Sequence, residues 1–199
     1  MQALTNNVTH YFTEEQAEPA FQQAKQKGLP LLVDCWAPNC KGCKKMEEST
    51  YQHPEVLSYI AQQFVFVKYN IINRNAQRLP CAPVLWTPTF IVFSNDGSEV
   101  RKTIGYLNYQ QFKAELEIGR ALALIRKAQP GNALSLLEDF IKQPDFIGTI
   151  PEALYWAGVA AYFVHQRDAD SITPYWERLI QDFPESNWAD KADCLHIKI

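Results

Sequence analysis

The 199-residue chain contains no run of about 18 consecutive apolar residues, so the sequence predicts no membrane-spanning helix. It also lacks a basic excess: the formal net charge is -3, which gives no indication of nucleic acid or an anionic membrane as a partner. The first residues have neither the basic nor the apolar segment of a secretory signal peptide. We therefore expect a cytoplasmic protein without nucleic-acid or membrane partners.

The number and spacing of the cysteines disfavour a disulfide framework and a metal site. The chain has five cysteines, an odd and widely scattered set: Cys35, Cys40, Cys43, Cys81 and Cys194. Structural zinc needs four ligands, and the sequence offers neither a second C-x-x-C motif nor paired histidines. We expect no metal, a Cys35 thiol buried in the core, and thiol chemistry at the closely spaced pair alone.

That pair, Cys40 and Cys43, lies at a predicted junction between a strand and a helix. An apolar run at 31–36 precedes it and a helix-forming run at 44–48 follows it, while 47% hydrophobic and 21% charged residues fit a globular chain with a core. Unpaired N–H groups at a helix start favour the thiolate form, which is the nucleophile in disulfide chemistry. The spacing therefore indicates a redox motif.

The residues around this motif resemble the thioredoxin family. Residues 36–46, W-A-P-N-C-K-G-C-K-K-M, are similar to the family's active-site stretch, and four further matches follow the family's order: Asp34, Lys68, Thr87-Pro88 and Gly105. The resemblance covers residues 7–122 and implies an α/β fold, with a central mixed sheet and helices on both of its faces. It also implies thiol–disulfide exchange without a bound cofactor.

The resemblance assigns roles to four candidate catalytic residues. Cys40 is the expected nucleophile, and Cys43 is the resolving thiol that attacks the mixed disulfide. Asp34, expected inside near Cys43, would take the proton of that thiol, and Lys68 on the neighbouring strand would pair with Asp34. A purely structural buried ion pair is the alternative for Asp34 and Lys68.

Six further residues are expected to bind the substrate. The resemblance places the Thr87-Pro88 bond, expected to be cis, opposite the thiols, where it would offer its backbone to an extended client segment. The Lys-Gly spacer departs from the family's Gly-Pro, and Trp86 stands where a small residue is usual. The six candidates are Trp36, Pro38, Lys41, Gly42, Thr87 and Pro88.

The order of elements predicted along residues 7–122 is that of a mixed sheet. A helix begins at the Thr13 capping box and ends near Gly28, and a hairpin turn at 95–97 joins two later strands. The expected strands are 31–35, 64–69, 90–93 and 100–104, and the expected helices after the first are 40–50, one beginning at Pro54, 74–79 and 109–127.

Residues 123–199 form a predicted all-helical extension. The expected helices are 133–142, 151–165, 172–182 and 188–195. Alanine-rich first helices and a proline after each second helix resemble degenerate tetratricopeptide repeats. Since two such units are fewer than usually stand alone, we expect the extension to share the helix at 109–127.

These features predict a thiol–disulfide oxidoreductase that reduces disulfide bonds of protein clients and receives electrons from a donor reductase. The alternative is a protein-binding module, in which the helical extension holds a partner and the thiols are vestigial or sense redox state.

Overall fold

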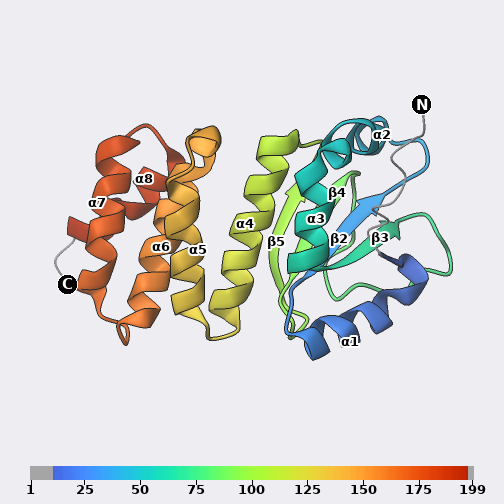
Figure 1. Ribbon diagram of the computed structural model, residues 1–199, viewed down its shortest axis with the longest axis horizontal. Coiled ribbons are helices and arrows are strands. Elements are labelled where there is room, and N and C mark those ends of the chain that lie inside the picture. The colour runs from blue at the N-terminus through green and yellow to red at the C-terminus, as the bar shows by residue number, and fades with distance from the viewer. Residues whose placement is uncertain (1–10, 197–199) are drawn as a thin grey trace. The chain divides into compact units, whose positions relative to one another are not determined.

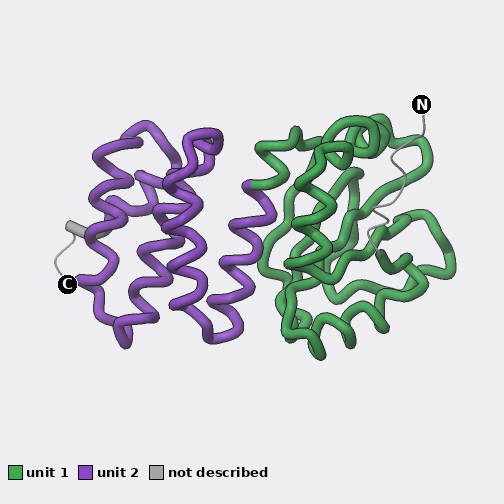
Figure 2. The backbone as a smooth tube through the Cα atoms, viewed as in Figure 1, with its two compact units in different colours: residues 1–113 green, residues 114–199 purple. Residues whose placement is uncertain are grey.

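The computed structural model describes residues 11–196 of the chain, which divides into two compact units. Unit 1 comprises residues 1–113 and unit 2 residues 114–199 (Figure 2). The division falls inside one helix, α4 (Tyr109–Arg126), whose residues 109–113 belong to unit 1. The expected boundary at 122/123 lies within the same helix and stays a prediction. The first domain was expected to start at residue 7, and this residue lies outside the described residues.

Unit 1 is built on a mixed five-stranded sheet of order β1-β3-β2-β4-β5 (Figure 1). β2 runs parallel to β3, which is parallel to β1, whereas β4 is antiparallel to both β2 and β5. The strands are β1 (Phe12–Thr13), β2 (Leu31–Trp36), β3 (Val65–Asn70), β4 (Thr89–Phe93) and β5 (Glu99–Ile104). The predicted α/β fold with a mixed sheet is therefore confirmed.

Helices cover both faces of this sheet, which explains the continuous apolar run of β2. On one face, Ala17, Ala20 and Ala24 of α1 (Ala17–Lys27) pack against Val33 and Cys35 of β2. α1 ends at Gly28, which adopts a left-handed φ of 65°.

Aromatic side chains pack together on the opposite face of the sheet. Tyr51 contacts the rings of Phe66 and Phe112, and Phe112 contacts Phe90 of β4. The other helices of unit 1 are α2 (Lys41–Glu48), α3 (Pro54–Gln63) and two 3₁₀ turns, Glu14–Gln16 and Thr50–Gln52. β2 is consequently buried between two helical layers, and its carboxyl end leads directly into the C-x-x-C turn.

One expected element of unit 1 is wrong: residues 74–79 do not form a helix. Backbone N–H groups in this segment bond elsewhere, from Asn75 to the side chain of Asn73 and from Gln77 to the carbonyl of Glu14. A local side-chain bond and a contact with a distant segment have therefore replaced the backbone bonds that a helix would need.

Unit 2 is all-helical, as predicted. Besides the last part of α4 it contains α5 (Pro130–Ile141), α6 (Ile150–Val164), α7 (Thr173–Asp182) and α8 (Asn187–Ala192), with 3₁₀ segments at Pro144–Thr149, Ala169–Ile172 and Asp193–His196. Ala114, Ile118 and Ala121 of α4 belong to the core of this unit, together with Leu137 and Leu154. The likeness to tetratricopeptide repeats stays a prediction.

Gly158 lies at a close contact between α6 and α7 in unit 2. A Cβ added there would lie 2.5 Å from Nε1 of Trp176 on α7. The indole is fixed in place, because its N–H donates to the Tyr155 carbonyl at 3.0 Å and its ring stacks on Tyr155 at 4.8 Å. Glycine therefore allows α6 and α7 to approach each other.

No helix within the described part of the chain combines the length and apolar character needed to cross a membrane.

Candidate functional site

The C-x-x-C pair is positioned by the start of α2. The helix begins at Lys41, one residue later than expected, so Cys40 is its N-cap. The backbone N–H of Cys43 donates to Sγ of Cys40 at 3.0 Å, and the two cysteines form a disulfide with their Cα atoms 5.2 Å apart. Cys40 is half-buried and Cys43 is buried. The more exposed thiol is thus the one predicted to be the nucleophile.

Asp34 and Lys68 meet as predicted, because their strands place them in register. β2 and β3 are parallel with Asp34 opposite Lys68, and Nζ of Lys68 lies 3.0 Å from Oδ2 of Asp34. Asp34 is almost fully buried. Since Val33 and Cys35 face α1, Asp34 points to the opposite face, the one on which Tyr51 packs.

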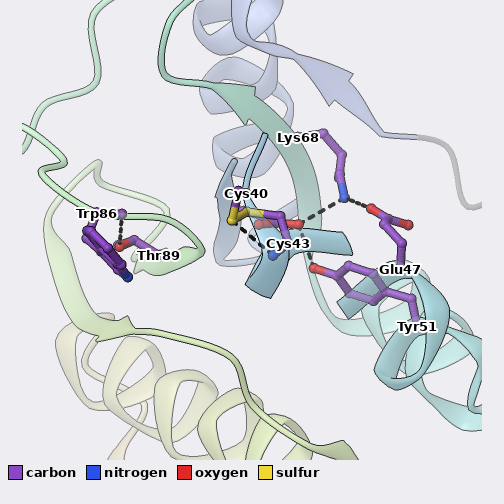
Figure 3. Close-up of a disulfide and its surroundings, with 8 residues drawn as sticks. Cys40, Cys43, Glu47, Tyr51, Lys68, Trp86 and Thr89 are labelled. Atoms are coloured by element: carbon purple, nitrogen blue, oxygen red, sulfur yellow. Dashed lines mark hydrogen bonds and ion pairs between the residues drawn. A yellow bond between two sulfur atoms is a disulfide. The ribbon is translucent and has the colours of Figure 1, made fainter. Parts of the chain in front are cut away.

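Two further residues complete this cluster, and sequence reasoning missed both. Tyr51 donates its hydroxyl to Oδ2 of Asp34 at 2.7 Å, and Glu47 forms an ion pair with Lys68. Figure 3 shows Lys68, Glu47 and Tyr51 converging beside the Cys40–Cys43 pair. The available signal was the spacing of Cys43, Glu47 and Tyr51 at intervals of four residues, which puts successive residues on one helical face.

The negative charges of Asp34 and Glu47 shift the pKa values of their neighbours Lys68 and Tyr51. Burial alone would lower the pKa of Lys68, but the negative charges of Asp34 and Glu47 outweigh it and raise that pKa. Burial, and then the Asp34 charge, raise the pKa of Tyr51 well above its ordinary value. Lys68 therefore stays charged and Tyr51 stays protonated at neutral pH, so both are permanent donors to Asp34.

An apolar groove of about 660 Å³ runs past the exposed side of the disulfide. We call it the thiol groove. Its walls come from the C-x-x-C turn, from Ile71 and Ile72, from the loop before β4, and from Gly105 and Tyr106 after β5. Five of the six expected substrate-binding residues line it: Pro38, Lys41, Gly42, Thr87 and Pro88.

Trp36 is the expected binding residue that does not line the thiol groove. It ends β2, and its indole nitrogen is buried without a hydrogen-bond partner among the described residues. Its place in client binding stays a prediction.

The loop before β4 supplies the most exposed apolar side chains of the thiol groove. Leu85 is 91% exposed and Trp86 68% exposed, so both add to the apolar surface of the groove. The peptide bond between Thr87 and Pro88 is cis, which confirms that prediction. Thr89 donates its hydroxyl to the Trp86 carbonyl at 2.7 Å (Figure 3) and so closes the turn of this loop.

The other three cysteines of the chain are free thiols. Cys35 is fully buried against α1, as predicted, and burial raises its pKa strongly. Cys81 is partly exposed and Cys194 is exposed. Within residues 11–196, no group of three or more His, Cys, Asp or Glu side chains is arranged to hold a metal ion.

Comparisons with known proteins agree with this arrangement. A family model described as a thioredoxin-like domain matches residues 17–119. Two curated relatives are named Thiol:disulfide interchange protein DsbD. The one from Tatumella citrea is 33% identical over 105 residues, which cover 50% of this chain and 18% of the relative. The one from Escherichia coli (strain K12) is 29% identical over 115 residues, which cover 55% of this chain and 20% of the relative.

The matched region therefore spans about a fifth of the length of these curated relatives. Among solved structures, the C-terminal domain of Neisseria meningitidis DsbD in the oxidised form is 21% identical with a TM-score of 0.43, covering 52% of this chain and 93% of that chain. The reduced form is also 21% identical, with a TM-score of 0.44, covering 54% and 99%.

Proposed function

The chain belongs to the thioredoxin-like domain family, and from that membership we propose that it reduces disulfide bonds of protein clients through Cys40 and Cys43. The observation that carries the proposal is the disulfide-bonded pair at the start of α2, open to the thiol groove on one side and backed by buried Asp34. The relatives named thiol:disulfide interchange proteins support the exchange of disulfides, while the reducing direction is our own inference.

The exchange would proceed in two displacements. The Cys40 thiolate attacks one sulfur of the client disulfide, and the other client sulfur leaves as a thiolate that takes a proton from water. Cys43 then attacks the Cys40 sulfur, its proton passes to Asp34, and the second client sulfur leaves. The client gains two electrons and the protein is left with the Cys40–Cys43 disulfide, the state seen in the structure.

This cycle needs two kinds of partner. The clients are proteins with accessible disulfides that can lay an extended segment in the thiol groove. A donor reductase must return two electrons to the Cys40–Cys43 disulfide after each turnover. The cytoplasm, as the compartment in which such a donor keeps thiols reduced, is part of the proposal.

Insulin reduction by dithiothreitol is the direct test. The full chain is expected to accelerate the reaction, and Cys40→Ser is expected to abolish the acceleration because the nucleophile is lost. Cys43→Ser should instead accumulate a mixed disulfide with the client, since nothing resolves it. Cys35→Ser is the matched control, because Cys35 is buried on the other face of the sheet. Full activity in Cys40→Ser would refute the proposal.

A further inference from the structure

The carboxylate of Asp34 is held asymmetrically. Both of its donors use one oxygen: the Tyr51 hydroxyl lies 2.7 Å and Nζ of Lys68 lies 3.0 Å from Oδ2. The other oxygen, Oδ1, is buried and has no hydrogen-bond partner among the described residues. A buried carboxylate oxygen without a donor is costly, so an unpaired one calls for a physical explanation.

We attribute the unpaired oxygen to the oxidised state of the site. Cys43 and Met46 are the buried residues of α2, and Tyr51, in the 3₁₀ turn after this helix, donates to Asp34. In the disulfide, the Cys43 sulfur carries no proton, so it has nothing to donate. In the reduced protein and in the mixed disulfide, Cys43 is a thiol, and a thiol S–H can donate a hydrogen bond.

We propose that Tyr51 is a positioning residue for proton transfer: together with Lys68 it fixes Oδ2, so that Oδ1 is the oxygen that accepts the Cys43 proton. The inference rests on the proposed reduction of client disulfides. In the resolving step the S–H bond of Cys43 breaks, an O–H bond forms at Oδ1, and the Cys43 sulfur bonds to Cys40. The client sulfur leaves with the electron pair of the broken S–S bond, and Asp34 later gives its proton to water.

Tyr51 suits this role because it remains a donor and is rigidly packed. Burial and the Asp34 charge raise its pKa, so the hydroxyl keeps its proton through the neutral range. Its ring contacts Phe66 at 6.4 Å and Phe112 at 5.6 Å between centroids. These ring contacts do not need the hydroxyl. Tyr51→Phe therefore removes one hydrogen bond and leaves the packing in place.

The charged and titratable groups around Asp34 come from three neighbouring segments. They are Lys68 on β3, Glu47 on α2 and Tyr51 in the 3₁₀ turn, besides the Cys40–Cys43 pair itself. The residues that β4 and α4 bring to this face, Phe90 and Phe112, are apolar. A change in the pH dependence after Tyr51→Phe would accordingly report on the Asp34 cluster.

The test follows the two displacements separately. The reduced full chain is mixed with a chromogenic aromatic disulfide, and stopped-flow absorbance records release of the first thiolate by Cys40 and of the second by Cys43, across a range of pH. Without the Tyr51 hydroxyl, the negative charge of the Asp34 carboxylate loses one of the two donors that hold Oδ2. The midpoint of the pH profile for the second release should therefore move up by about one pH unit, with about tenfold slower release below the midpoint. The two proteins should converge at higher pH, and the first release should be unchanged.

Two comparisons make the result specific. Tyr109→Phe also removes a tyrosine hydroxyl that donates to a carboxylate, that of Glu55 at 2.8 Å, and it should leave both releases unchanged. In an Asp34→Asn background, Tyr51→Phe should have no further effect on the pH profile, because the proton acceptor is already gone.

The outcomes separate this inference from the proposed function. If the unmodified protein releases no second thiolate, the proposed disulfide reduction fails. If it releases both, but Tyr51→Phe leaves the midpoint in place or slows the second release equally at every pH, Tyr51 is only structural and the inference is overturned.

Discussion

Lys41 is the one charged residue among those that line the thiol groove. The remaining wall is largely apolar, including the exposed side chains of Ile72, Leu85 and Trp86. A client segment bound there would meet a positive charge directly beside the nucleophile. We therefore expect the groove to favour clients with an acidic side chain close to the reactive cysteine.

A charge reversal tests this preference. We expect a disulfide-linked peptide with glutamate next to its cysteine to be reduced up to about fivefold faster than its lysine counterpart at low salt. Lys41→Glu should reverse the order, and about 1 M salt should remove it in both proteins. Lys44→Glu is the control, because Lys44 lies on α2 outside the groove and pairs with Glu48. Equal rates for both peptides with the unmodified protein would contradict the prediction.

The candidate site was predictable where residues match the motif of the thioredoxin family. Asp34 and Lys68 were identified by that resemblance, and strand register brings them together. Tyr51 and Glu47 were not predictable in the same way, because their contacts depend on how α2 and the following 3₁₀ turn lie on the sheet. A tyrosine among aromatic core residues looks like packing until the partner of its hydroxyl is known.

At the scale of elements, strands and helices with strong periodicity or clear caps were predicted to within a few residues. Asn108 accepts from the backbone N–H of Gln111 at 2.9 Å at the start of α4, and His53 accepts from the backbone N–H of Glu55 and caps α3. The predicted helix at 74–79 was wrong because the backbone of this segment bonds to Glu14, more than fifty residues away, and no local sequence pattern encodes such a contact.

The contact between α6 and α7 gives a prediction for unit 2. Gly158→Ala would force its new methyl group into the indole of Trp176, and we expect a loss of about 1–3 kcal/mol in the free energy of unfolding. Gly131→Ala is the matched control: no atom lies within 4 Å of its added Cβ, so stability should stay equal or rise by about 0.5–1 kcal/mol. Urea denaturation followed by far-UV circular dichroism measures both, and equal stability of Gly158→Ala and the unmodified protein would show that the indole can yield.

At the scale of the whole molecule, the division at 113/114 leads us to expect that unit 1 folds without the later helices of unit 2. A fragment ending after Ala128 keeps every residue of the thiol groove and of the Asp34 cluster. We expect it to fold and to accelerate insulin reduction at a rate close to that of the full chain. An unfolded or inactive fragment would mean that unit 1 depends on unit 2.

The complementary fragments test the same division from the other side. Residues 129–199 lack Ala114, Ile118 and Ala121, which belong to the core of unit 2, whereas residues 114–199 retain them. We expect cooperative thermal unfolding only for the longer fragment, because the shorter one would expose the apolar surface that α4 covers. Equal cooperativity in both fragments would show that the residues of α4 are not needed to stabilise unit 2.

The N-cap position of Cys40 has a consequence for the energy of the redox couple. The sulfur that exchanges electrons is also the acceptor for the backbone N–H of Cys43 at the start of α2. An ionised sulfur accepts such a bond more strongly than a sulfur in a disulfide, so reduction strengthens the cap and tightens the first turn of the helix. By thermodynamic linkage, any difference in the stability of α2 between the reduced and oxidised states contributes to the reduction potential. We therefore expect a substitution near the end of α2 that weakens the helix, without contacting either thiol, to change how readily the protein gives up its electrons.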